Sequence, residues 1–114
     1  MAKIYGIATC GSVKNAFKFF KDNGLAYEFI DFKKTPICSN KIKEWLKQVD
    51  IDILLNTKGT KYKTLKLKEL NLDNKQKLEW IGKENLLIKR PIIEFENRVF
   101  VGFDENLYKR EFLK

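Results

Sequence analysis

The chain has 114 residues, of which 44% are hydrophobic and 33% are charged, and its formal net charge at pH 7 is +8. This length fits one domain, residues 1–114, and no apolar run approaches the roughly 18 residues that a membrane-spanning helix needs. Histidine is absent, so the commonest zinc ligand and the commonest general base are missing, and we expect neither a metal site nor membrane binding.

The first residues indicate a cytoplasmic protein. Met1-Ala2-Lys3 leads directly into a predicted strand, without the apolar segment of a secretory signal. In the cytoplasm we expect both cysteines, Cys10 and Cys38, to be reduced.

The first third of the chain predicts a β-α-β unit. Residues 3–8 read as a buried strand, and an amphipathic helix follows over residues 13–23, where Asn-Gly ends it. Residues 27–32 alternate well enough for a second strand, which the crossover rule makes parallel to the first. Residues 33–37 then form a loop that contains a proline.

The middle of the chain predicts helices. Ser39 or Asn40 begins an amphipathic helix, and a short helical turn follows over residues 52–55. Residues 56–60 read as a loop, and residues 72–84 as a further helix.

The last part of the chain predicts a hairpin and a final helix. Two β-rich runs, residues 92–95 and 98–101, flank the turn Glu96-Asn97. Asp104 caps a helix that ends at Phe112. The element order is therefore β-α-β, helical insert, β-β-α.

This order predicts a single α/β (α+β) domain on a mixed four-stranded sheet. We place its core at about residues 1–37 and 87–114, and the helical insert at about residues 38–86.

Cys10 lies where the first predicted strand turns into the first predicted helix. Helix-start N–H groups, here those of Gly11, Ser12 and Val13, have no partner within the helix. They stabilise a thiolate, which lowers the pKa of a cysteine, and they also bind oxyanions. The sequence therefore predicts that Cys10 is a nucleophile, and the alternative is an inert buried thiol.

The neighbours of Cys10 leave several roles open. Ser12 donates its hydroxyl or N–H to a bound group, or it caps the helix. Lys14 supplies positive potential, or it is a solvated residue of the first turn. Asn15 lies beyond the cap, and we expect its side chain to support the Cys10 loop.

Four short motifs follow one another along the chain. They are Cys10-Gly11-Ser12-Val13-Lys14-Asn15, Leu54-Leu55-Asn56-Thr57-Lys58-Gly59-Thr60, Ile88-Lys89-Arg90-Pro91-Ile92 and Val101-Gly102-Phe103. Together they resemble the ArsC/Spx family of thioredoxin-like proteins over nearly the whole chain, and most closely its YffB-like branch with a single cysteine. The resemblance implies a thioredoxin-like three-layer fold and glutathione-linked thiol chemistry.

In this resemblance Arg90 and Pro91 complete the site. Pro91 takes the position of the cis-proline beside the nucleophile loop, and the alternative is an ordinary trans proline at a strand start. Arg90 directs its guanidinium toward Cys10, where it lowers the pKa and binds an oxyanion. The alternative for Arg90 is a surface ion pair with Glu94 or Glu96.

The arginine pattern indicates little arsenate reduction. Arsenate reductases of this family carry three arginines around the cysteine, and only Arg90 is matched here. Asn56 and Val101 stand at the other two positions, Lys58 is the nearest cation, and Arg98 falls on the opposite strand face from Val101. Lysine replaces the charge of arginine but not its planar fork.

Spx-type regulators carry a Cys-x-x-Cys switch and a glycine that contacts the RNA polymerase α-subunit. Here Val13 stands at the second cysteine position, and residues 49–53 contain no glycine. We therefore expect a thiol oxidoreductase without a bound cofactor, which uses glutathione as co-substrate and has glutathione or glutaredoxin as its partner. The alternative is an Spx-like regulator that binds the α-subunit through its insert. Cys38 is the one possible resolving thiol, or else an incidental cysteine.

The densest group of basic residues lies in the insert and comprises Lys58, Lys61, Lys63, Lys66 and Lys68. These lysines form an ordinary solvated surface, or they meet an acidic protein or a nucleic acid. Because arginines and interleaved exposed aromatic residues are missing there, we expect no direct binding of nucleic acid.

Overall fold

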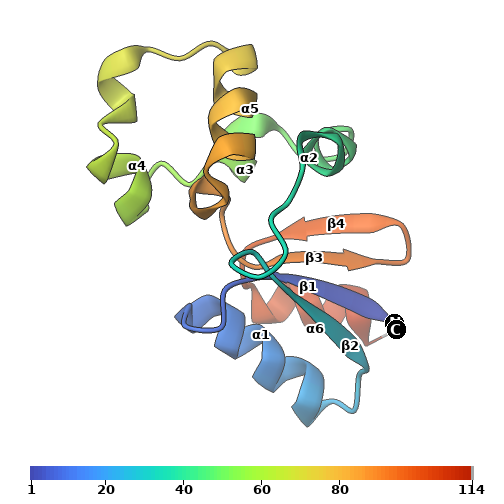
Figure 1. Ribbon diagram of the computed structural model, residues 1–114. Coiled ribbons are helices and arrows are strands. Elements are labelled where there is room, and N and C mark those ends of the chain that lie inside the picture. The colour runs from blue at the N-terminus through green and yellow to red at the C-terminus, as the bar shows by residue number, and fades with distance from the viewer. Residues whose placement is uncertain (114) are drawn as a thin grey trace.

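The computed structural model describes residues 1–113, and Lys114, the last residue of the predicted domain, lies outside them. Its centre is a four-stranded sheet with the strand order β2-β1-β3-β4 (Figure 1). The strands are β1 (Ala2–Gly6), β2 (Tyr27–Asp31), β3 (Ile92–Phe95) and β4 (Arg98–Val101). β1 and β2 are parallel, whereas β3 is antiparallel to both of its neighbours, so the sheet is mixed as predicted.

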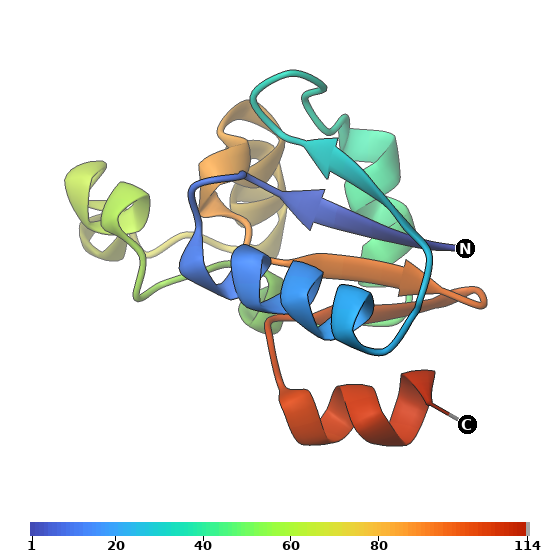
Figure 2. The ribbon, with the colours of Figure 1, turned by 90° about the horizontal axis from the view of Figure 1, so that it is seen from below.

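Helices cover both faces of the sheet (Figures 1 and 2). One face carries α1 (Gly11–Asp22) and α6 (Glu105–Phe112). The other face carries α2 (Ser39–Leu46), α3 (Ile51–Leu54) and α5 (Asn74–Lys83). These are the three predicted layers, and within the described residues no helix combines the length and apolar character that crossing a membrane requires.

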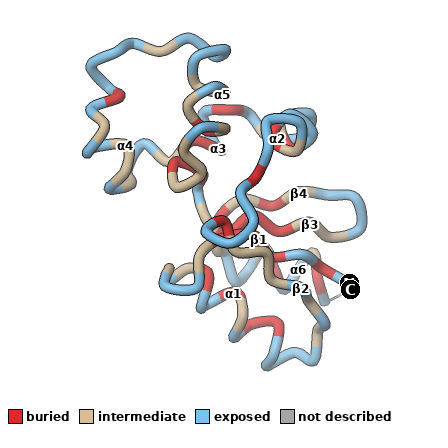
Figure 3. Tube along the Cα trace, in the orientation of Figure 1, coloured by how far each residue is buried: buried red, intermediate tan, exposed pale blue. Residues whose placement is uncertain are grey.

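The core has two parts because neighbouring residues of the central strands face opposite layers. Ile4 and Ile93 are buried against α1 and α6, whereas Tyr5 and Ile92 are buried against α2. Figure 3 shows this burial concentrated in the sheet and in the helix faces that pack on it. Burial on both faces explains why the first strand reads as an apolar run rather than as an alternation.

Helix starts differ by a few residues from the predicted ones. Cys10 and Cys38 are the N-cap residues of α1 and α2, with extended backbones and without a side-chain cap hydrogen bond. The prediction of Ser39 or Asn40 as the cap of α2 is therefore wrong, because Ser39 is already helical. α5 begins later than predicted because Asp73 forms a capping box there.

Three short elements between α3 and β3 were not predicted from the sequence. They are α4 (Thr60–Thr64), the 3-10 helix η1 (Leu67–Leu70) and a second 3-10 helix, η2 (Asn85–Leu87), which leads toward β3. Lys66 and Asn71, on either side of η1, have the positive φ angles 54° and 47°. Left-handed residues interrupt a helix, so this segment divides into short pieces.

The predicted hairpin joins β3 to β4. Its turn residues, Glu96 and Asn97, have φ angles of 50° and 63°, so a two-residue turn forms there without glycine. On the outer edge of β4 the side-chain amide of Gln48 donates to the carbonyl of Asn97 (2.9 Å) and accepts from the N–H of Val99 (3.1 Å).

Candidate active site around Cys10

Cys10 lies in the turn between β1 and α1, at the end of the sheet where β1 stops. Its N–H donates to the carbonyl of Ile7 (3.2 Å), and its carbonyl accepts from the N–H of Lys14 (3.0 Å). Cys10 is half-buried and is not part of a disulfide, and Cys38 is exposed and also free. The Cys10 thiol therefore stands at the positive end of α1.

The surroundings of Cys10 lower the pKa of its thiol below the ordinary value. Burial raises this pKa, but hydrogen bonds from the N–H of Val13, the guanidinium of Arg90 and the N–H of Ser12 stabilise the thiolate and outweigh it. The positive charge of Arg90 acts in the same direction. The thiolate is the nucleophilic form of a cysteine, so this environment favours reaction at Cys10.

Arg90 reaches the thiol from the segment just before β3. Its Nη1 donates to the carbonyl of Leu86 (3.0 Å), and its Nε is buried without a hydrogen-bond partner among residues 1–113. The alternative of an ion pair with Glu94 or Glu96 is wrong, because no carboxylate of the described residues pairs with Arg90. Arg90 therefore keeps donor capacity for an anion beside the thiol.

The Arg90–Pro91 peptide bond is cis, and Pro91 is buried. The second motif, residues 54–60, holds this segment in place, since residues 54–56 pair with residues 87–89. An antiparallel bridge joins Leu55 to Ile88, and two backbone hydrogen bonds of 2.8 Å flank it.

The last motif, residues 101–103, is hydrogen-bonded to Pro91. The N–H of Gly102 donates to the carbonyl of Pro91 (2.8 Å), and the hydroxyl of Tyr108 donates to the carbonyl of Gly102 (2.6 Å). Gly102 has a φ of +83°, in the left-handed region where a side chain is strained. The second and the last motif therefore both hold the segment that carries Arg90 and Pro91, and Arg90 in turn interacts with Cys10 of the first motif.

Gly6, which the sequence analysis did not single out, sets the approach of α1 to β1. A Cβ atom at Gly6 would stand 2.6 Å from Cγ2 of Val13 and 3.8 Å from Cβ of Arg90. Val13 is fully buried, so the missing side chain lets the start of α1 come close to Arg90. A glycine inside a strand pattern is the signal that indicates such an approach.

Three predicted site residues are not bonded to the thiol through their side chains. Lys14, Asn15 and Lys58 are exposed, and within residues 1–113 no side-chain hydrogen bond or ion pair joins them to Cys10. Asn15 lines a shallow hollow between α1 and α6 instead. Gly11 is also exposed, and a Cβ atom there would meet nothing within 4 Å.

The other predicted arginine positions contribute no guanidinium to the site. Asn56 and Val101 are half-buried and uncharged. Arg98 pairs with Glu111 of α6 (3.0 Å) and lies over the ring of Phe100 at 4.9 Å. Since Asn56 and Val101 are uncharged and Arg98 is paired with Glu111, none of these three positions brings a guanidinium to Cys10.

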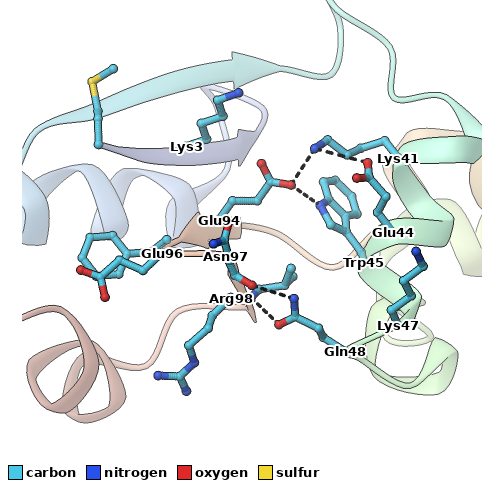
Figure 4. Close-up of a pocket in the computed structure, with 13 residues that line it drawn as sticks. Lys3, Lys41, Glu44, Trp45, Lys47, Gln48, Glu94, Glu96, Asn97 and Arg98 are labelled. Carbon is cyan, nitrogen blue, oxygen red and sulfur yellow. Dashed lines mark hydrogen bonds and ion pairs between the residues drawn. The ribbon is translucent and has the colours of Figure 1, made fainter.

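A hollow of about 470 Å³ lies between α2 and the β3–β4 hairpin, at the opposite end of β1 from Cys10 (Figure 4). On its wall Glu94 accepts hydrogen bonds from the Tyr5 hydroxyl (2.7 Å) and the Trp45 indole (2.8 Å), and pairs with Lys41 (2.9 Å). Burial raises the pKa of Glu94, but these three partners outweigh it and hold the pKa below its ordinary value. The carboxylate therefore ties α2 to the sheet.

The chain is similar to known proteins over nearly its whole length. A model of the ArsC family matches residues 5–110. The chain is 32% identical to the global transcriptional regulator Spx 2 of Oceanobacillus iheyensis over 105 residues, covering 90% of this chain and 77% of that one. The solved structure of a YffB (PA3664) protein is similar with a TM-score of 0.89 and 28% identity, covering 96% and 97% of the two chains. An arsenate reductase (ArsC) related protein from Brucella melitensis is similar with a TM-score of 0.78 and 31% identity, covering 97% and 93%.

Proposed function

Because the chain belongs to the ArsC family and has its thioredoxin-like fold, we propose that it is a thiol oxidoreductase with Cys10 as nucleophile. The observation that carries this proposal is the half-buried thiol at the start of α1, whose pKa is lowered by two backbone N–H groups and by Arg90. An inert structural cysteine does not require a neighbouring arginine, and here the Nε of Arg90 is buried without a hydrogen-bond partner among residues 1–113.

The proposed reaction is thiol–disulfide exchange with glutathione. The Cys10 thiolate attacks one sulfur of glutathione disulfide, the disulfide bond breaks, and the second glutathione leaves as a thiolate. Arg90 and the N–H groups of Ser12 and Val13 stabilise the negative charge at the sulfur and bind the carboxylate of the incoming molecule. A glutaredoxin thiolate then attacks the glutathionyl sulfur and releases the Cys10 thiolate, so in this exchange glutathione disulfide is the substrate that is reduced and glutaredoxin is the reductant.

Arsenate fits this site poorly, and we propose a sulfur substrate instead. Only Arg90 offers a guanidinium near Cys10, so a tetrahedral oxyanion lacks the contacts that three arginines give. We expect weak or absent arsenate turnover with glutathione and glutaredoxin. A rate comparable to that of a three-arginine enzyme, assayed in parallel, would show that another cation substitutes.

Mass spectrometry after incubation with glutathione disulfide tests the proposal. We expect one glutathionyl group on Cys10 that glutaredoxin removes, and slower formation of this adduct in Arg90→Gln. Cys38→Ser is the matched control and should keep the adduct, whereas Cys10→Ser should lose it. An adduct confined to Cys38 would overturn the proposal.

A second candidate function is transcriptional regulation, which the relative named Spx 2 supports. The resemblance to Spx regulators implies the RNA polymerase α-subunit as partner. This candidate function excludes a Cys-x-x-Cys redox switch, because Val13 stands at the second cysteine position and is fully buried. Under this candidate, Cys10→Ser leaves saturable α-subunit binding intact in a pull-down, and no glutathione adduct forms at Cys10.

A further inference from the structure

A lysine-rich lobe projects from the fold on the side of the molecule where the turn into α1 lies. It comprises residues 58–70, including α4 and η1, and carries the lysines Lys58, Lys61, Lys63, Lys66 and Lys68. In both Figure 1 and Figure 2 the lobe lies on the same side of the molecule as the turn that leads into α1. All of these lysines are exposed except Lys61, which is half-buried (Figure 3).

The charges of the lobe are not neutralised within the described part of the chain. None of its lysines forms an ion pair with a carboxylate of residues 1–113, and Glu69 is the single acidic residue among residues 58–70. Elsewhere in the described residues Lys18, Lys41, Lys77 and Lys109 pair with carboxylates, whereas others, such as Lys21 and Lys43, do not. The lobe differs from the rest of the surface in its density of charge, with five lysines between positions 58 and 68. The lobe therefore projects a positive potential over a Debye length of about 8 Å in physiological salt.

The base of the lobe is fixed to the segment that carries Arg90. Residues 54–56 pair with residues 87–89, directly before Arg90, and a tight turn then leads into the lobe. In that turn the side chain of Asn56 accepts from the N–H of Lys58 (3.3 Å). A Cβ atom at Gly59 would stand 2.7 Å from the side-chain amide nitrogen of Asn56, so a larger residue there would displace this amide.

We propose that this lobe selects the disulfide substrate of Cys10, and that the substrate is an acidic protein or peptide whose carboxylates contact the lysines. The proposal rests on the thiol oxidoreductase function proposed above. Small disulfides reach the thiol and Arg90 alone, whereas a larger substrate also covers the lobe. Paired opposite charges at an interface speed the encounter and orient the two partners, here with the disulfide toward the thiolate.

Nucleic acid fits the lobe less well than an acidic protein. Residues 58–70 contain no arginine, so the planar fork that grips phosphate is missing. Their single aromatic residue, Tyr62, is half-buried against the apolar core rather than displayed for base stacking. The proposed thiol chemistry also requires a partner that carries sulfur.

The reaction with this substrate is an ordinary exchange. The Cys10 thiolate attacks one sulfur of the partner's disulfide, that disulfide bond breaks, and the other sulfur leaves as a thiolate. A glutathione thiolate then attacks the Cys10 sulfur of the mixed disulfide, releases the reduced partner, and leaves Cys10 as a glutathione adduct for glutaredoxin.

Two synthetic peptides test the lobe. Both carry one cysteine in the same chromogenic mixed disulfide, flanked by glutamates in one peptide and by glutamines in the other. We expect the glutamate peptide to react with Cys10 about tenfold faster at low ionic strength, and this preference to fall as salt is added. Equal rates for the two peptides would overturn the proposal.

Matched variants locate the effect. Lys58→Gln, Lys63→Gln and Lys68→Gln together should abolish the preference for the glutamate peptide. The control removes equal charge from exposed, unpaired lysines of α1, α2 and the residue after α2, as Lys21→Gln, Lys43→Gln and Lys47→Gln, and should keep it. Equal loss in both variants would show an effect of net charge alone and contradict the proposal.

Two further measurements separate the outcomes. Alkylation of Cys10 by neutral iodoacetamide should be unchanged in both lysine variants, which shows that they are folded and that the thiol is intact. If Cys10 is alkylated only at the rate of an ordinary free thiol, the proposed function is contradicted. The peptide preference is a separate measurement, so the two failures can be distinguished. A single-stranded oligonucleotide and a glutamate peptide without cysteine are each added as competitors of the reacting glutamate peptide. Inhibition by the oligonucleotide at the lower concentration would identify nucleic acid as the partner and overturn the proposal.

Discussion

At Cys10, burial and hydrogen bonding act on the thiol in opposite directions. Burial favours the neutral thiol, whereas two helix-start N–H groups and Arg90 favour the thiolate, and the second effect is larger. Arg90 differs from the backbone donors because a substitution can remove it without altering the helix. A substitution of Arg90 therefore measures how much the guanidinium lowers the pKa of Cys10.

We predict that Cys10 has a pKa below the value of about 8.5 for a free cysteine, and that Arg90→Gln raises it. Alkylation by iodoacetamide, followed against pH with peptide mapping, measures the midpoint. At pH 7 the variant should react roughly threefold to tenfold more slowly, because a smaller fraction is thiolate. Arg110→Gln, in α6, is the control, and equal midpoints in the two variants would refute the role of Arg90.

At the scale of the elements, the close packing of α1 on β1 determines the distance between the Cys10 thiol and Arg90. The missing side chain at Gly6 creates this approach, since a Cβ atom there would overlap a methyl group of Val13. Protein interiors are close-packed, so even one added methyl group must displace its neighbours.

We predict that Gly6→Ala lowers the free energy of unfolding by about 1–3 kcal/mol and also slows alkylation of Cys10. In a Val13→Ala background the clashing methyl is gone, so the same substitution should cost less, which a double-mutant cycle by urea unfolding measures. Gly11→Ala is the control, because an added Cβ atom there meets nothing within 4 Å. Additive costs at positions 6 and 13 would contradict the steric explanation.

Besides its apolar packing, α2 is linked to the sheet by one carboxylate. Glu94 binds Tyr5 of β1 as well as Trp45 and Lys41 of α2, and its pKa in the folded protein lies below its ordinary value. A depressed pKa means that the stabilisation is present at neutral pH, above the pKa of the unfolded chain. It is lost as the pH falls through the folded pKa.

We predict that Glu94→Gln reduces the free energy of unfolding at pH 7 by about 1–3 kcal/mol. The difference between the wild type and this variant should begin to shrink near the ordinary glutamate pKa of about 4.3, where the unfolded chain takes up the proton, and should be lost once the pH falls below the lower pKa of the folded protein. Urea unfolding at several pH values measures this. Glu44→Gln removes an exposed carboxylate and should change stability by less than about 0.5 kcal/mol, so a similar loss there would contradict the specific role of Glu94.

At the scale of the whole molecule, the fold is elongated, with extents of 44 × 27 × 26 Å. Burial is distributed unevenly over it: α4 has no buried residue, and Leu67 is the buried residue of the lobe. The sheet, in contrast, is covered on both faces. Local stability should therefore differ strongly between the two regions.

We predict that native-state hydrogen exchange is fastest in residues 58–70 and slowest in β1 and β3. Few buried apolar contacts hold the lobe, so its amides open without unfolding the sheet. Exchange read out by mass spectrometry measures this difference. If the amides of α4 were protected as strongly as those of β1, the lobe would be an integral part of the core.

The sequence predicted those parts of the fold whose signals are local. The hairpin and the cap at Asp104 follow from residues adjacent in the chain, and both are confirmed. α4 and η1 were missed because their lysine-rich segment has little apolar periodicity, and its breaks at Lys66 and Asn71 depend on backbone angles. The partnership of Cys10 with Arg90 was expected from the family resemblance, since no local pattern relates residues so far apart.

The amide of Gln48 has a consequence for how copies of this chain behave in concentrated solution. β4 lies at the rim of the sheet, where unpaired backbone groups invite a strand from another molecule. Gln48 already occupies the carbonyl of Asn97 and the N–H of Val99, so it imitates the neighbouring strand that is absent. An incoming strand must first expel this amide, which makes the start of β4 a poor template for fibre-like aggregation.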